Sequence, residues 1–351
     1  MTQPTGKKPH KWTSQRQGFV DSLHYMRGRK KGEIKSFRTP WPKVNDATTD
    51  GFEWHSTTVI GGRPGTGKTL IKDQIIREGF ILNAGENFRV LEFQFEMLAR
   101  TSAIREYSSV IGRTYKYLCS ADGQISEEDL QKCYEYAKER VKYPIDVVEE
   151  PCTVKEFKET IIAYMQEFST LEMVKETYKE GEVTKEREVQ RRIYKKTVVT
   201  LDHSLLLKKN KAEGEKDKHD TLFALGEVVT ELKRKYPIHF IILSQLNRGI
   251  DSPERNEDGK YGNYVLDSDI FGADALLQHA DTLIGLNRPG KQKIRFYGPD
   301  RYIIDDDTVM VMHFLKCRNG DVRMSFFKCQ FKQMKIVEMP TPGQQEKRLK
   351  T

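Results

Sequence analysis

The stretch Gly62-Arg63-Pro64-Gly65-Thr66-Gly67-Lys68-Thr69 has the pattern of a phosphate-binding loop. A β-branched run at 57–60 precedes it and a run with helical spacing at 70–76 follows, so the sequence predicts a strand, a glycine-rich turn and a helix. Glycines let backbone N–H groups point at phosphate oxygens, and the start of the helix adds the positive end of its dipole. We expect Lys68 to neutralise phosphate charge and the Thr69 hydroxyl to ligate Mg²⁺. The alternative, a glycine-rich turn that binds nothing, is disfavoured by the complete pattern in this context.

Composition and charge narrow the class of protein. The 351 residues allow one large α/β domain with an arm, and the net charge is +8. Residues 1–50 hold eleven Lys/Arg against four Asp/Glu, so the excess is concentrated in a basic arm, which either meets nucleic acid or is a solvated tail. No apolar run approaches a membrane span, and the N-terminus lacks a signal-peptide stretch. The five cysteines form no Cys-x-x-Cys pair, which favours a reducing compartment.

Strands and helices are predicted to alternate along the chain. After the phosphate loop, strands are expected at 88–95, 145–148, 197–202, 238–243, 281–287, 308–316 and 322–337, the last two as a candidate hairpin. Helices are expected from about Met97 and at 126–142, 154–169 and 219–235. The charged segment 172–196 is either a helix pair or a hairpin. This alternation predicts an α/β fold with a mostly parallel central sheet and helices on both faces.

A short amphipathic helix is predicted in the basic arm. Ser14 is a suitable cap, and Phe19, Leu23 and Met26 recur with helical spacing until the basic run 27–32 ends the helix. Its apolar stripe must pack either on its own domain or on a neighbouring subunit. We therefore divide the chain into three parts: an arm with a linker helix at 1–35, a catalytic domain at 36–339 and a flexible basic tail at 340–351.

Polar side chains follow several of the predicted strands. Glu96 follows the strand 88–95, Asp202 ends the strand 197–202, and Gln245 follows the strand 238–243. Ligands of parallel sheets bind at the carboxyl ends of the strands. The sequence therefore predicts that these three side chains and the phosphate loop form one site. His203, next to Asp202, is expected to be a packing residue rather than a ligand.

Five segments in order resemble the motor domain of DnaB-type replicative helicases, which are RecA-like ATPases, and the resemblance covers about residues 36–338. They are the phosphate loop, Phe95-Glu96-Met97, Leu201-Asp202, Leu243-Ser244-Gln245-Leu246-Asn247-Arg248 and Lys316-Cys317-Arg318-Asn319-Gly320. The resemblance implies an ATP- and Mg²⁺-dependent replicative helicase in the cytoplasm of a bacterial or phage-infected cell. It would act on single-stranded DNA as a ring of identical subunits, hexameric like the rings of the family. The resemblance also implies unwinding in the 5′ to 3′ direction.

The resemblance also implies roles for the site residues. Glu96 is the catalytic base, Asp202 holds Mg²⁺ through its water shell, and Gln245 senses the γ-phosphate. Arg318 would be an arginine finger supplied to the next subunit, assisted by Lys316, which is expected on the same face of the same strand. Isolated subunits should therefore hydrolyse ATP poorly.

The chain departs from the family pattern at three places. The family's N-terminal collar domain is not found, and the helix in the arm resembles the family's linker helix. Where the family carries an Arg-Glu-Ser-Gly run that contacts DNA, this chain reads Phe271-Gly272-Ala273-Asp274. Basic residues of two loops are therefore the expected contacts to single-stranded DNA: Lys208, Lys209, Lys211, Arg248, Arg255 and Lys260. Primase motifs are not found either, so priming or loading would need a separate protein.

Two other functions share part of this pattern. A RecA-like recombinase would have the same phosphate loop and Asp202, but Glu96-Met97 and the Lys316/Arg318 motif argue against it. A regulatory ATPase of the same fold would act on partner proteins without DNA. Filaments in place of rings would indicate the first, and failure to bind single strands would indicate the second.

Overall fold

The computed structural model describes residues 12–180, 183–210, 212, 214–256 and 262–344, and it divides into two units, Met1–Ser36 and Phe37–Thr351. In the first unit the helix α1 spans Gln15–Lys31, and the side chain of Ser14 accepts a hydrogen bond from the backbone N–H of Gln17, as predicted. The basic run does not cut the helix short but forms its last turn, where cations are favoured by the dipole, and Gly32 ends it in the left-handed conformation. Its predicted apolar stripe, Phe19, Leu23 and Met26, is exposed.

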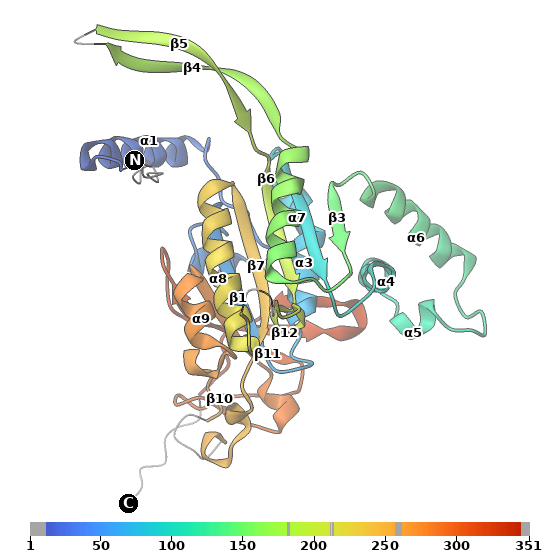
Figure 1. Ribbon diagram of the computed structural model, residues 1–351. Helices are drawn as coiled ribbons and strands as arrows, with labels where there is room; N and C mark the ends of the chain where they lie inside the picture. The colour runs from blue at the N-terminus through green and yellow to red at the C-terminus, as the bar shows by residue number, and fades with distance from the viewer. Residues whose placement is uncertain (1–11, 181–182, 211, 213, 257–261, 345–351) are drawn as a thin grey trace, which may run out of the picture. The chain divides into compact units, whose positions relative to one another are not determined.

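A mostly parallel sheet forms the centre of the second unit (Figure 1). Across the described residues its strand order is β13-β12-β11-β8-β1-β7-β6-β2-β3. The parallel strands are β1 (Ser56–Gly62), β2 (Phe88–Gln94), β3 (Ile145–Val148), β6 (Lys196–Asp202), β7 (Ile238–Gln245) and β8 (Thr282–Asn287). The antiparallel strands β11 (Val309–Cys317), β12 (Met324–Gln330) and β13 (Lys335–Glu338) complete one edge. The predicted α/β class is confirmed.

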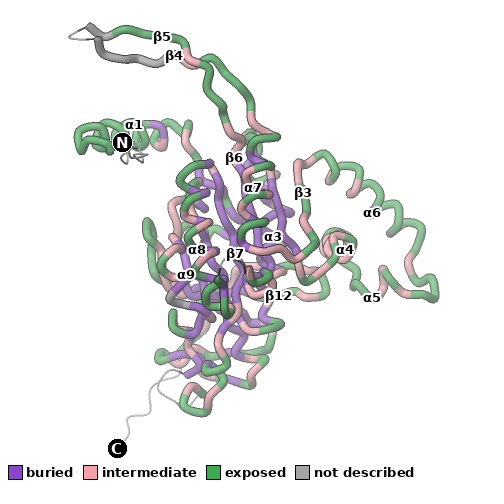
Figure 2. Tube along the Cα trace, in the orientation of Figure 1, coloured by how far each residue is buried: buried purple, intermediate pink, exposed green. Residues whose placement is uncertain are grey.

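Helices cover both faces of this sheet, and the buried residues follow its strands (Figure 2). The helices of this unit are α2 (Pro42–Ala47), α3 (Lys68–Leu82), α4 (Ala99–Ile111), α5 (Tyr115–Leu118), α6 (Glu127–Arg140), α7 (Val154–Glu167), α8 (Lys218–Lys235) and α9 (Ala273–His279). On one face, Phe157 of α7 and Leu225 of α8 pack in a single apolar core. On the other face, Ile71 and Ile75 of α3 pack in a second core. The apolar faces of these helices are thus used as their spacing predicted.

The structure resolves or corrects several predicted segments. The charged segment is the hairpin of β4 (Thr170–Glu180) and β5 (Val183–Ile193), which extends away from the central sheet beside α7 (Figure 1). The single strand predicted at 322–337 is wrong: a 3₁₀ turn at Phe331–Gln333 divides it into β12 and β13.

A small two-stranded sheet, β9 (Phe296–Tyr297) and β10 (Tyr302–Ile303), was not predicted. Gln344 bridges to Tyr302, so the described part of the predicted tail is attached to the domain. Within the described residues, no helix is both long and apolar enough to cross a membrane.

Candidate active site

The predicted phosphate loop joins the end of β1 to the start of α3. Gly65 and Gly67 have φ values of 74° and 105°, in the left-handed region where a side chain would be strained. A Cβ at Gly62 would lie 2.5 Å from Oγ1 of Thr66, so the loop curls too tightly for any larger residue there. The predicted order of strand, glycine turn and helix is confirmed, and the turn leaves a cradle that a Cβ would fill.

Lys68 and Thr69 are the last residues of this loop and the first residues of α3. The Lys68 ammonium donates hydrogen bonds to the carbonyl oxygens of Gly62 at 2.7 Å and Arg63 at 3.3 Å. Burial lowers the pKa of Lys68, and the charges of Asp202 and Glu96 partly offset that effect. The Lys68 ammonium is thus held by carbonyls rather than by a carboxylate, which suits it to receive a phosphate.

A hydroxyl and a carboxylate meet next to the loop. The Thr69 hydroxyl donates to Oδ2 of Asp202 at 2.8 Å, and Asp202 is buried at the end of β6. Oxygen ligands of this kind are what Mg²⁺ prefers, with water completing its shell. These two residues therefore fit the predicted Mg²⁺ site.

The register of the sheet brings the predicted side chains together at the carboxyl ends of the parallel strands, which we call the carboxyl edge. Gly62 of β1 pairs with Gln245 of β7, and Asp202 of β6 pairs with Gln94 of β2. Because β6 and β7 are also parallel neighbours, all four carboxyl ends lie side by side. The predicted convergence on one edge follows directly from this strand order.

Glu96 lies two residues beyond β2 and is exposed to solvent. Burial lowers the pKa of both Lys68 and His203, and the charge of Glu96 opposes part of that lowering at each residue. Glu96 therefore faces the same site as the phosphate loop. Its exposure leaves the carboxylate in contact with water, which a base that activates water requires.

His203 has a closer relation to the site than the sequence indicated. Its Nε2 lies 3.3 Å from Nε2 of Gln245, and burial lowers the pKa of the ring, which favours the neutral form. The expectation of a purely packing role is incomplete, because the ring also holds the Gln245 amide. Only its place directly after Asp202 hinted at this contact.

Residues outside the motifs brace the phosphate loop. Arg288, buried just after β8, donates to the Gly65 carbonyl at 3.0 Å and also to the Asp307 carbonyl. Arg63 of the loop forms an ion pair with Asp251 at 2.6 Å. Sequence reasoning missed Arg288, since a single arginine after a strand carries no recognisable pattern.

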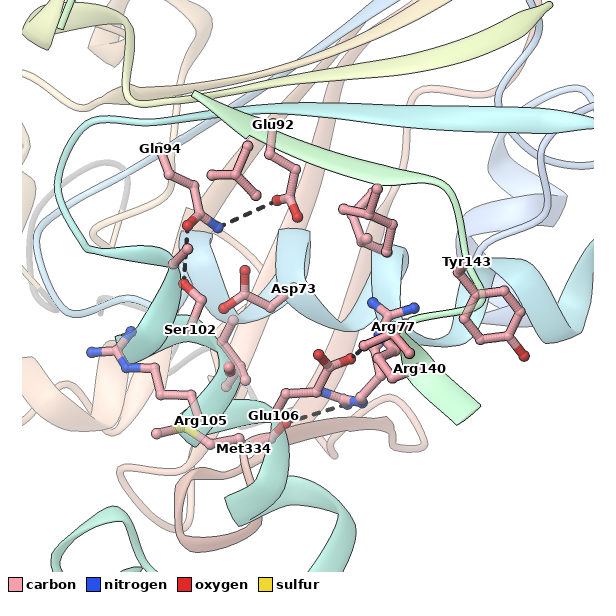
Figure 3. A pocket seen from close by; sticks show the side chains of 17 residues that line it. Asp73, Arg77, Glu92, Gln94, Ser102, Arg105, Glu106, Arg140, Tyr143 and Met334 are labelled. Atoms are coloured by element: carbon pink, nitrogen blue, oxygen red, sulfur yellow. Dashed lines mark hydrogen bonds and ion pairs between the residues drawn. The ribbon is translucent and has the colours of Figure 1, made fainter. Parts of the chain in front are cut away.

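A buried charge cluster lies beneath the site on the inner side of α3. The ammonium of Lys72, one turn after Lys68, is fully buried and contacts Glu92 at 2.6 Å and Asp73 at 2.8 Å. Burial disfavours this ammonium, but the two carboxylates outweigh that effect and raise its pKa. The cluster borders a cavity of about 340 Å³ between α3 and α4, in which Ser102 donates to Gln94 and Gln94 to Glu92 (Figure 3). No motif predicted this cluster, since Lys72 and Asp73 look like the polar side of a helix.

Lys316 and Arg318 lie at the opposite end of the sheet, where the parallel strands begin. β11 runs antiparallel to β8, and Cys317 is opposite Thr282, which is opposite Thr58 near the amino end of β1. The expectation that both cations share a strand is wrong in detail, because β11 ends at Cys317 and Arg318 lies in the following turn.

Both cations nonetheless contact one segment of the chain. Lys316 donates to the Leu277 carbonyl at 2.5 Å, and Arg318 forms an ion pair with Asp281 at 3.3 Å. Leu277 is in α9, and Asp281 precedes β8. The side chain of Arg318 remains 57% exposed. The phosphate loop of the same chain lies at the other end of the strands.

The predicted DNA contacts divide into three groups. Lys208, Lys209 and Arg248 are exposed beyond the carboxyl ends of β6 and β7. Arg255 instead donates to both carboxylate oxygens of Asp269 and is mostly buried. Lys211 and Lys260 lie outside the described residues. Three exposed cations thus remain on the side of the sheet that carries the phosphate loop.

The fold and this site define an α/β P-loop NTPase domain of the RecA-like type. The model of the DnaB-like helicase C-terminal domain matches residues 39–336, and the chain belongs to that family. Replicative DNA helicases DnaB of Helicobacter pylori strains J99 and 26695 are each 25% identical to it, over 262 and 264 residues. Each alignment covers 74% of this chain and 46% of the relative, so the chain matches less than half the length of these relatives.

Two solved structures have the same fold. The ATPase domain of G40P matches with a TM-score of 0.73 and 15% identity, covering 94% of this chain and all of that one. A DnaB-like replicative helicase, determined with its interactions with primase, matches with a TM-score of 0.70 and 15% identity, covering 95% of this chain and 69% of that one. At 15% identity the two structures support the assignment of the fold and nothing further.

Proposed function

We propose that the protein is an ATP-dependent replicative DNA helicase that works as a ring. The observation that carries the proposal is the separation of two half-sites within one chain. The phosphate loop, Glu96, Asp202 and Gln245 share the carboxyl edge of the sheet, whereas Arg318 lies at the opposite edge. A ring of identical subunits would place one edge against the other and complete each site.

At the carboxyl edge, the residues are arranged for phosphoryl transfer to water. The backbone of the loop and Lys68 would bind the β- and γ-phosphates of ATP, and Thr69 and Asp202 would hold Mg²⁺. When bound, Mg²⁺ would neutralise negative charge on the phosphates. Glu96 would orient a water and accept its proton, and Gln245 would donate a hydrogen bond to the γ-phosphate. The neutral ring of His203 keeps the Gln245 amide in place.

At the amino edge, Arg318 would stabilise the transferring phosphoryl group of a neighbouring subunit. A guanidinium is always charged and presents several donors, which suits charge spread over phosphate oxygens. Lys316 would add a second cation. Each subunit would then give a finger to one neighbour and receive one from the other, as in a hexameric ring.

Single-stranded DNA is the proposed substrate track. Gln245 ends β7, and the loop that follows it carries Arg248. A change in the Gln245 contact when the γ-phosphate leaves would therefore shift a cation that tracks the DNA backbone. Lys208 and Lys209 follow β6 in the same way. Movement would run 5′ to 3′, and a separate primase or loader would act with the ring.

The test is strand displacement of a forked duplex with ATP and Mg²⁺, together with ATP hydrolysis measured with and without single-stranded DNA. We expect displacement and a DNA-stimulated rate. Hydrolysis that DNA does not change, with no displacement, would refute the helicase proposal. Filaments in electron micrographs would then favour a recombinase, and absence of binding to labelled single strands at modest salt would favour a regulatory ATPase.

A further inference from the structure

Two contacts from Asp281 hold the proposed finger Arg318 in place. Its guanidinium pairs with Oδ1 of Asp281 at 3.3 Å, and its backbone N–H donates to the Asp281 carbonyl at 2.8 Å. Asp281 therefore contacts both the guanidinium and the backbone of this arginine. Contacts at both ends limit the directions that a long, flexible side chain can take.

Asp281 is itself held by three hydrogen bonds to Lys233 and Thr57. Its Oδ2 accepts from the buried Lys233 ammonium at 2.5 Å and from the backbone N–H of Thr57 at 2.9 Å. Its own backbone N–H donates to the Thr57 carbonyl at 2.9 Å. Lys233 is anchored in turn by the His279 carbonyl at 3.0 Å. A carboxylate held this firmly offers Arg318 a fixed partner.

We infer that Asp281 is a positioning residue for Arg318, and that Lys233 supports it. The guanidinium lines a cavity of about 280 Å³ and keeps most of its surface exposed. Among the residues that the structure describes, the guanidinium forms this one ion pair, at a single Nη, which leaves its other N–H groups available to phosphate oxygens. Asp281 thus directs the arginine toward the interface without occupying its whole fork. This inference rests on the proposed trans role of Arg318.

The same segment connects the finger to the nucleotide sensor. The Phe271 N–H donates to the Gln245 carbonyl at 2.8 Å, and α9 then leads to Leu277, which holds Lys316, and on to Asp281. A shift at Gln245 would therefore be transmitted to both cations of the trans motif. Positioning by Asp281 would link the state of one subunit's nucleotide to the finger it offers its neighbour.

The experiment uses mixed rings in which the two half-sites come from different subunits. Subunits with Lys68→Ala keep Arg318 and act as donors; subunits with Arg318→Ala keep their phosphate loop and act as recipients. An equal mixture should hydrolyse ATP although neither variant does so alone. Asp281→Asn is then introduced either into the donor or into the recipient.

We expect Asp281→Asn in the donor to lower the kcat of the mixture by about tenfold, in line with the loss of a positioned charged group. The KM for ATP should stay within about twofold, because ATP binds to the recipient's loop. In the recipient, which lacks Arg318, the same substitution should leave the rate unchanged. The exposed Asp321, three residues beyond Arg318, supplies the matched control, and Asp321→Asn should have no effect in either subunit.

Equal losses from donor and recipient, or no loss from the donor, would overturn the role of Asp281. Failure of the parent mixture to hydrolyse ATP would instead contradict the trans role of Arg318 itself. Thermal unfolding checks that each variant folds. If Asp281→Asn does not fold, Lys233→Gln takes its place, since it loosens the carboxylate without removing it, and the same donor-specific loss is expected.

Discussion

Removal of the Arg318 guanidinium tests whether the active site is shared between subunits. Cys317 is level with Thr58, four residues before Gly62, and Arg318 lies beyond it. At a rise of about 3.3 Å per residue, and with strands about 4.8 Å apart, Arg318 is roughly 19 Å from the start of its own phosphate loop. No arginine side chain spans that distance, so Arg318 can directly contact only a phosphate that a neighbouring subunit holds.

The expected result of Arg318→Ala is a fall in kcat of about 10³-fold, the lower end of what supplied arginine fingers contribute. The KM for ATP should change little, since the loop and Lys68 remain intact. Steady-state hydrolysis gives both constants, and nucleotide binding to the variant confirms that its own loop is folded.

Mixing experiments give the sharper measurement. In a ring with head-to-tail interfaces, an equal random mixture of Lys68→Ala and Arg318→Ala subunits contains about a quarter of intact composite sites. The rate should therefore recover toward a quarter of the wild-type value if the sites act independently. A double variant, Lys68→Ala/Arg318→Ala, mixed with Arg318→Ala is the control and should recover nothing. Full activity of Arg318→Ala alone, or of wild-type subunits shown to be monomeric, would refute the reasoning.

Three further predictions concern the base, the buried charge cluster and acid stability. Glu96→Gln should retain ATP binding while hydrolysis falls by at least about 100-fold, and normal turnover would show that another group is the base. Lys72→Met should lower the free energy of unfolding in urea by about 3–5 kcal/mol, because it leaves the buried Glu92 carboxylate without its cationic partner. The double variant Lys72→Met/Glu92→Leu should recover most of that loss. Strictly additive effects of the two substitutions would contradict the pairing. The pKa of His239 is lowered to about 4 by burial, so as pH falls from about 6.5 toward 4 the unfolded state takes up the proton and up to about 1.4 kcal/mol of stability is lost per pH unit. His239→Asn should reduce the slope of unfolding free energy against pH in that window, and an unchanged slope would show that other groups dominate it.

The motifs at strand ends were predictable because their chemistry is local. The glycines of 62–67 specify their own turn, and a β-branched run ending in Asp202 specifies both a strand and its carboxyl end. Once the strands are parallel, the edge where Glu96 and Gln245 gather follows from the topology. The sequence therefore predicted that the phosphate loop, Asp202, Glu96 and Gln245 gather at the carboxyl ends of the strands, whereas their roles in hydrolysis stay predictions.

Residues that act through distant contacts could not be predicted in this way. Arg288 braces Gly65 across more than two hundred residues, and Lys233 meets Asp281 only because α8 ends beside the start of β8. Neither residue belongs to a recognisable motif, so its sequence context resembles that of a surface residue. Lys72 was missed for a similar reason, since a charged residue on a helix is normally solvated, whereas Lys72 is completely buried against Glu92.

The direction of β11 accounts for the proposed sharing of the active site between subunits. Parallel strands joined by helices carry every strand-end motif to the carboxyl edge, where the phosphate loop lies. β11 enters the same sheet antiparallel to β8, so the residues that follow it emerge at the amino edge. The proposed finger, Arg318, follows this strand and therefore lies at the opposite end of the parallel strands from the phosphate loop of its own chain. Complementary half-sites on opposite edges generate a head-to-tail interface, and a head-to-tail interface that closes on itself is a ring.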